Sequence, residues 1–113
     1  MSDEFQYDIA AVATELRIRP EILKKLLESF SNTLSEKIIQ LDMLVPVNDT
    51  DKIRAIMHEV KGTGGNLRLT KVYETADTMH VAVKAEEPQN KILNLFEEFK
   101  EASNLFIEHI KHS

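Results

Sequence analysis

The chain has 113 residues, 42% of them apolar and 29% charged, with a formal net charge of −5. This length suits one domain with a single core and excludes two, and the composition is that of a globular rather than a disordered protein. The acidic balance excludes a general attraction to nucleic acid, and the lack of cysteine excludes disulfides and thiolate metal sites. We expect a single domain over residues 1–113.

The sequence carries no mark of export or of a membrane anchor. No apolar run approaches the roughly 20 residues that a membrane-spanning helix needs. The acidic start, Met1-Ser2-Asp3-Glu4, does not have the pattern of a signal peptide. A chain without cysteine suits a reducing compartment, so we expect a cytoplasmic protein that makes no membrane contact.

The first part of the chain predicts a short helix and then a long one. Apolar residues from Phe5 to Leu16 recur at helical spacing and indicate a short helix lying across a larger bundle. Pro20 suits the first turn of the second helix, and Pro46 is its expected stop. The apolar stripe of this second helix contains Ile22, Leu23, Leu26, Leu27, Phe30, Leu34, Ile38, Leu41 and Leu44.

Three further helices are predicted after Pro46. Any residue of the run 48–51 can cap the central helix, and Thr70 is expected to cap the next one. The run 86–88, Glu-Glu-Pro, separates that helix from the last. Four long amphipathic helices with short connections bury their stripes together. We therefore expect an all-α fold, an up-down-up-down four-helix bundle with an additional short N-terminal helix.

All three glycines of the chain fall within the pattern of the central helix, at Gly62, Gly64 and Gly65. A glycine inside a helix costs about 0.5 to 1 kcal/mol relative to alanine, so three together cost roughly 2 to 3 kcal/mol. One interpretation is that the run from Gly62 to Asn66 ends the helix as a loop, because glycine and asparagine are natural C-terminal caps. The other is that the helix continues and uses a surface without side chains.

A helical wheel places one histidine at the centre of that surface. At about 100° per residue, His58 lies about 140° from Ile53 and therefore points away from the core. Gly64 falls on the core side, where it allows close helix packing. The residues that surround His58 on the wheel are Arg54, Lys61, Gly62 and Gly65.

These residues carry a resemblance to a known family. The run His58-Glu59-Val60-Lys61-Gly62, followed by Gly65 and Leu67, resembles the histidine phosphotransfer (HPt) motif of multistep phosphorelays, commonly His-x-x-Lys-Gly with small residues and Leu-Gly after it. Arg68 stands where the family usually has the last glycine. His80 stands where members often carry a Glu or Gln that hydrogen-bonds the active histidine.

The resemblance implies a phosphocarrier rather than an enzyme. His58 would accept a phosphoryl group from a receiver-domain aspartate or from a (hybrid) histidine kinase and relay it to another response-regulator receiver. Lys61 and His80 would support the histidine, while Arg54, Gly62 and Gly65 would form the receiver-docking face. The chain would bind no cofactor, since Mg²⁺ is expected on the partner receiver. We expect a monomer, because the transfer mechanism requires only one copy of the chain.

Other interpretations of the same residues remain open. His58 can be an ordinary surface histidine, Lys61 a solvated lysine and His80 a partly buried histidine. The alternative function is a non-phosphorylated helical adaptor that binds receiver domains or other signalling proteins through this face. A metal-binding protein using the four histidines is a third possibility, but His109 and His112 have no nearby third ligand, so we expect no metal site.

Overall fold

The computed structural model describes residues 5–112, and within that range every regular element is an α-helix. The all-helical prediction is therefore confirmed, whereas the acidic start at residues 1–4 lies outside the described part. None of the described helices combines the length and the apolar character that crossing a bilayer requires. The five helices are α1 (Ile9–Leu16), α2 (Pro20–Leu44), α3 (Thr50–Asn66), α4 (Thr70–Lys84) and α5 (Gln89–Lys111).

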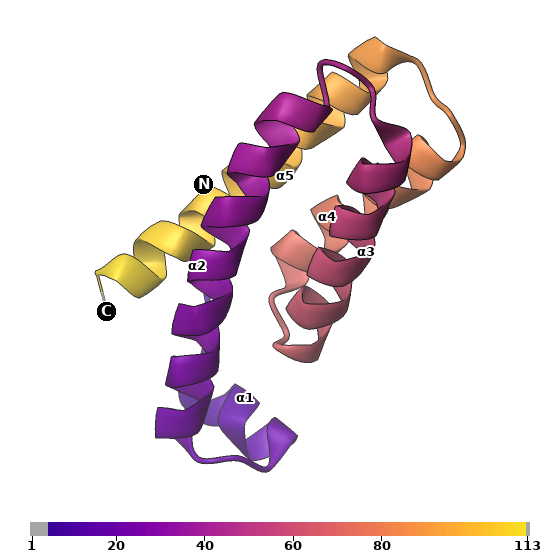
Figure 1. Cartoon of the computed structure of the whole chain (residues 1–113). Helices are drawn as coiled ribbons and strands as arrows, with labels where there is room; N and C mark the ends of the chain where they lie inside the picture. The colour runs from indigo at the N-terminus through magenta and orange to yellow at the C-terminus, as the bar shows by residue number, and fades with distance from the viewer. Residues whose placement is uncertain (1–4, 113) are drawn as a thin grey trace.

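The helices after α1 pack in a closed cycle. α2 packs on α3, α3 on α4, α4 on α5, and α5 returns to α2, while α1 packs on α2. Figure 1 shows α3 and α4 side by side as a hairpin, with the long helices α2 and α5 crossing each other beside it. Lys100 of α5 strengthens this crossing, because its ammonium lies 3.4 Å from a carboxylate oxygen of Asp42 in α2. The arrangement leaves α3 and α4 with one shared outer surface.

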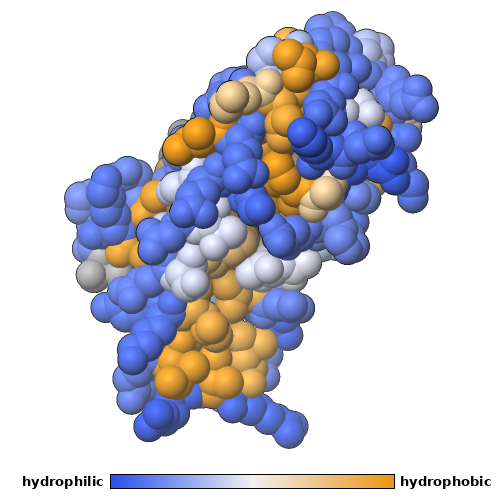
Figure 2. Space-filling model, viewed as in Figure 1, coloured by the Kyte–Doolittle hydropathy of each residue, from blue (hydrophilic) through white to orange (hydrophobic). Residues whose placement is uncertain are grey.

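The core is one cluster of apolar side chains that includes residues from all five helices, among them Leu27, Met57 and Phe99, which are completely buried. Two members of the predicted stripe of α2 are not part of it. Ile22 is 37% exposed and Leu26 45% exposed, because Leu23 and Leu27, one position later, occupy the core-facing side of the same turns. Apolar side chains accordingly reach the surface at the end of the molecule formed by α1 and the start of α2 (Figure 2).

Capping side chains determine where α1 and α3 begin. The Asp8 carboxylate accepts a hydrogen bond of 3.0 Å from the Ala11 amide, so α1 begins after it, and Phe5, which was predicted to belong to this helix, lies outside it. The Phe5 ring instead packs against α5, 5.6 Å from the Phe106 ring centre. At α3 the capping residue is Asp49. Of the four candidate caps at residues 48–51, Asp49 is therefore the one that caps α3, because its carboxylate accepts a hydrogen bond from the Lys52 amide.

The predicted cap of α4 was wrong by one residue. Thr70 is the first helical residue, and the N-cap position belongs to Leu69, which makes no side-chain capping bond. The reason is packing, since Leu69 is 1% exposed and its burial decides where the chain turns. A hydroxyl cap at this position would have to replace a core side chain.

The turn between α3 and α4 has the hydrogen bonds of a Schellman motif. The Leu69 amide donates to the Gly64 carbonyl at 2.9 Å, and the Arg68 amide donates to the Gly65 carbonyl at 3.1 Å. Arg68 has a positive φ of 61°, the left-handed conformation that glycine adopts most readily. Glycine would adopt this conformation without strain. Here the Arg68 guanidinium pairs with the Glu15 carboxylate of α1.

Candidate functional site

The helix α3 runs without interruption through its three glycines. Gly62, Gly64 and Gly65 are all helical, and the helix ends only at Asn66. The interpretation of this run as a loop is therefore wrong. Because the helix continues, the helical wheel describes the whole segment. His58 is exposed and Ile53 is completely buried, as the wheel predicts.

Two cross-helix contacts define how α3 and α4 face each other at the site. The ring centres of His58 and His80 lie 6.1 Å apart, and the Lys61 ammonium lies 2.9 Å from Oδ1 of Asp77. The two α3 residues are three positions apart along the chain, and the two α4 residues are three positions apart in the opposite direction. The two helices are therefore antiparallel, and the predicted pair His58 and His80 is brought together.

The two imidazoles are neighbours, but no hydrogen bond joins His58 to His80 among the bonds of the described residues. An N–H···N bond between two imidazoles places the ring centres about 5 Å apart, so the observed spacing is wider by about 1 Å. The rings are tilted by 42°. Closing this gap requires a small rotation of the side chains.

The surroundings of His80 favour its neutral form. Burial lowers its pKa from the ordinary value of 6.5, and the nearby charges of Lys61, His58 and Arg54 lower it further, while Asp77 acts in the opposite direction. A neutral imidazole has one nitrogen that accepts a hydrogen bond. The neutral form of His80 is thus suited to accept a hydrogen bond from the protonated ring nitrogen of His58.

Lys61 has a partner that the sequence analysis missed. Its ammonium donates a hydrogen bond to the Asp77 carboxylate, and the two side chains are 26% and 38% exposed. Asp77 stands three residues before His80, just as Lys61 stands three residues after His58. That symmetry was visible in the sequence, but it indicates a contact only once α3 and α4 are known to be antiparallel.

Gly62 and Gly65 belong to the same face but have different surroundings. A Cβ added to Gly62 would meet nothing within 4 Å, so the surface beside His58 is open there. A Cβ added to Gly65 would come within 3.1 Å of Cδ1 of Tyr73, whose ring covers that position. Tyr73 and Val81 of α4, 41% and 57% exposed, add apolar surface.

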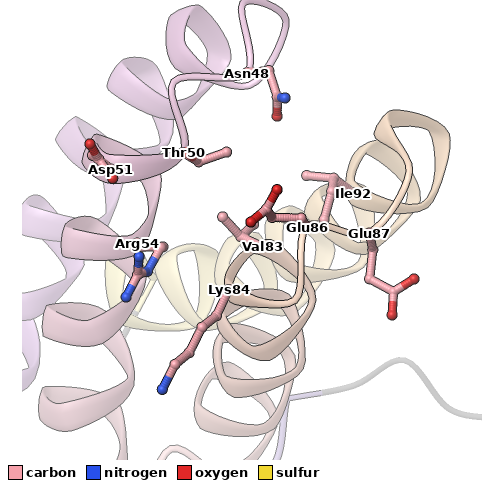
Figure 3. Close-up of a pocket in the computed structure, with 9 residues that line it drawn as sticks. All are labelled: Asn48, Thr50, Asp51, Arg54, Val83, Lys84, Glu86, Glu87 and Ile92. Atoms are coloured by element: carbon pink, nitrogen blue, oxygen red, sulfur yellow. The ribbon is translucent and has the colours of Figure 1, made fainter.

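The predicted docking residue Arg54 lies at the other end of the face, on the rim of a hollow of about 400 Å³. Lys84 of α4 lines the same hollow, and Figure 3 shows the two cationic side chains on neighbouring helices. Neither makes an ion pair within residues 5–112. The pattern of α3 alone predicted Arg54 and gave no reason to select Lys84.

The four histidines do not form one site. His58 and His80 share the α3–α4 face, whereas the His109 ring packs 4.9 Å from that of Phe5, and His112 lies 3.3 Å from a Glu108 carboxylate oxygen. Within the described part of the chain, no group of three or more His, Cys, Asp or Glu side chains is placed to hold a metal ion. The four histidines therefore do not come together to form a common metal site.

The side chains gathered here suit an imidazole nucleophile that receives an anionic group. His58 presents its ring to solvent, and His80 offers an acceptor whose neutral form is favoured. Lys61, Arg54 and Lys84 supply positive charge, with the Asp77 carboxylate on Lys61 and three further carboxylates, Asp51, Glu86 and Glu87, on the wall of the hollow. Cationic surroundings lower the free energy of a bound phosphoryl group. No protein-family model, no curated protein and no solved structure matches this chain.

Proposed function

We propose that the protein is a histidine phosphotransfer protein, in which His58 accepts a phosphoryl group from the aspartate of a receiver domain, or from a histidine kinase, and passes it to another receiver. The observation that carries this proposal is the exposed imidazole of His58 beside the open surface at Gly62. A partner's active site can approach such an imidazole without steric collision. The type of reaction is inferred from the resemblance of the run 58–62 to the HPt motif.

The transfer follows from the chemistry of a neutral imidazole. The unprotonated nitrogen of His58 attacks phosphorus, the N–P bond forms, and the P–O bond to the receiver aspartate breaks, returning its electron pair to the carboxylate. After the small side-chain rotation that closes the gap between the rings, the protonated nitrogen of His58 can donate a hydrogen bond to His80, whose neutral form is favoured. Lys61 offsets charge on this side, and the Mg²⁺ of the receiver does so on the other.

We also propose that α2 to α5 form the up-down-up-down four-helix bundle expected of this family, with α1 as the additional helix. The closed cycle of packing among these four helices supports the proposal, as does the antiparallel pairing of α3 with α4. In this arrangement the phosphorylated histidine stands on the outside of the bundle. The partner receiver and its Mg²⁺ would supply the catalytic groups, so we infer a carrier and not an enzyme.

Phosphoryl transfer from a labelled receiver tests the proposal. The wild-type protein should gain label that is stable to alkali and labile to acid, as expected for phosphohistidine, and His58→Gln should gain none. His112→Gln, an exposed histidine at the end of α5, is the matched control and should behave like the wild type. Transfer to His58→Gln at the wild-type level would contradict the proposal.

The same experiment separates the carrier from a phosphate-free adaptor. Tyr73, which lies against Gly65, and Val81, which follows His80, provide exposed apolar surface on α4, and a receiver could bind there without exchanging phosphate. In that case the receiver would bind wild type and His58→Gln equally, and neither would become labelled. A carrier instead loses its signalling function with His58→Gln.

A further inference from the structure

We propose that Asp77 is a positioning residue that holds the Lys61 ammonium in competition with a phosphoryl group on His58, and so keeps the phosphohistidine easy to discharge. This inference rests on the proposed function. It starts from one contact, the 2.9 Å pair between Lys61 Nζ and Asp77 Oδ1. The family motif explains Lys61, but it includes no carboxylate to neutralise it.

Phosphorylation places two anions beside one ammonium. A phosphoryl group carries about −1.5 to −2 charges at neutral pH, and Lys61 lies one helical turn from His58, within the range of side-chain pairs on a helix. The Asp77 carboxylate already occupies that ammonium. Because Lys61 and Asp77 are both partly exposed, their pair is weak enough to exchange. The phosphoryl group therefore shares a cation and also meets a nearby negative charge.

The other charges of this face do not take the place of Asp77. Arg54 and Lys84 are cations without an ion pair in the described residues. Asp51, Glu86 and Glu87 line the same hollow, but none of these carboxylates forms an ion pair with Arg54, Lys84 or Lys61 in the described residues. Glu59, the next residue after His58, has its carboxylate 3.1 Å from the Lys37 ammonium of α2, on the opposite side of α3. Asp77 is thus the carboxylate that contacts a cation of the site.

The consequence concerns discharge of the carrier. In the onward step the N–P bond of His58 breaks, a P–O bond forms with the receiver aspartate, and the electron pair returns to the imidazole nitrogen. Ammonium contacts to the phosphoryl oxygens stabilise phosphohistidine and oppose this step. By retaining Lys61, Asp77 raises the free energy of the phosphorylated state, which makes transfer to the next receiver more favourable.

The test uses the full chain and a chemical donor. Potassium phosphoramidate, which transfers phosphoryl groups to imidazole without any protein partner, is used to load the wild type and the variants, and ³¹P NMR follows the loss of the phosphohistidine signal. We expect the signal of Asp77→Asn to last about two to five times longer, the range that a partly exposed ion pair provides. Equilibrium transfer to a receiver should fall by the same factor.

Three further variants separate this role from a structural one. Glu74→Gln removes the same charge from α4 three residues earlier, at an exposed side chain, and should leave the lifetime unchanged. Asp77→Glu should restore the wild-type lifetime. In a Lys61→Met background, replacement of Asp77 should have a smaller effect, because the ammonium for which the two anions compete is gone.

The outcomes are distinct. An Asp77→Asn lifetime equal to or shorter than that of the wild type would overturn the role of Asp77, and so would an equal lengthening in Glu74→Gln. If neither phosphoramidate nor a labelled receiver phosphorylates His58 in the wild type, the proposed function itself is what fails.

Discussion

Tyr73 of α4 lies against Gly65 of α3, so that a Cβ on Gly65 would come within 3.1 Å of the tyrosine ring. The equivalent atom on Gly62 would meet nothing within 4 Å. Alanine is favoured over glycine in a helix interior by about 0.5 to 1 kcal/mol. We expect Gly62→Ala to increase the free energy of unfolding by this amount, measured by urea denaturation.

Gly65→Ala should gain less stability than Gly62→Ala, because the ring of Tyr73 must shift by a few tenths of an ångström to admit the methyl group. In a Tyr73→Ala background the obstacle is gone, and the two alanine substitutions should become equally stabilising. Equal effects of both substitutions in the wild-type background would show that the ring moves freely.

Bulk at Gly62 should affect a protein partner and not a small donor. A Gly62→Gln side chain extends into the open space beside His58 and should slow phosphoryl transfer from a receiver by at least about tenfold, as expected for a misplacement of about 1 Å. Loading of His58 by phosphoramidate should remain unchanged, since that donor needs little room. Comparing the two rates in one preparation checks the prediction, which is wrong if both fall together.

His80 should titrate below its ordinary pKa of 6.5, because burial and then the charges of Lys61, His58 and Arg54 disfavour its protonated form. The folded protein then binds fewer protons than the unfolded chain between the folded-state pKa and 6.5. The stabilisation from neutral His80 is thus fully present above pH 6.5 and is lost as the pH falls through the folded-state pKa.

An NMR titration of the His80 imidazole checks this directly. Denaturation measured across the same pH window should show a flatter pH dependence for His80→Gln than for the wild type. A His80 signal that titrates at 6.5 or above would contradict the expected environment.

The left-handed backbone conformation of Arg68 predicts that the substitutions Arg68→Ala and Arg68→Gly differ in stability. Arg68→Ala and Arg68→Gly both lose the contact with Glu15 and the hydrogen bonds to the Gly65 and Asn66 carbonyls. Only glycine relieves the positive φ of 61°, a conformation that costs other residues about 1 to 2 kcal/mol. Arg68→Gly should therefore be more stable than Arg68→Ala by at least about 1 kcal/mol.

Tyr7 ties the N-terminal segment to the turn after α3. Its hydroxyl donates a 2.6 Å hydrogen bond to the Leu67 carbonyl, and burial, partly opposed by Arg68, raises its pKa from 10.0 to about 12. Tyr7→Phe should lower the free energy of unfolding by about 0.5 to 1.5 kcal/mol. The protonated phenol stabilises the fold fully below pH 10, and this contribution is lost as the pH rises through about 12.

A spectrophotometric titration tests the second part. The phenolate absorbance that appears near pH 12 in the wild type should be missing in Tyr7→Phe.

Much of the fold was predictable because it depends on local chemistry. Helical spacing of apolar residues and the fixed φ of Pro20 and Pro46 are properties of short segments, and the α2 boundaries agree with them. The exposure of His58 could be read from a wheel for the same reason. Where packing decides, the prediction failed, as at Thr70, whose neighbour Leu69 is buried and takes the cap position.

The pairing across helices was decided by the tertiary structure alone. Nothing local to α3 indicates that Asp77 holds Lys61, that Tyr73 covers Gly65, or that His80 stands 6.1 Å from His58. These contacts depend on the register of two antiparallel helices, which is set by how their apolar faces pack. The sequence by itself therefore determined that the His58 side of α3 faces solvent, and the packing of α3 on α4 determined which side chains meet His58 and Lys61 there.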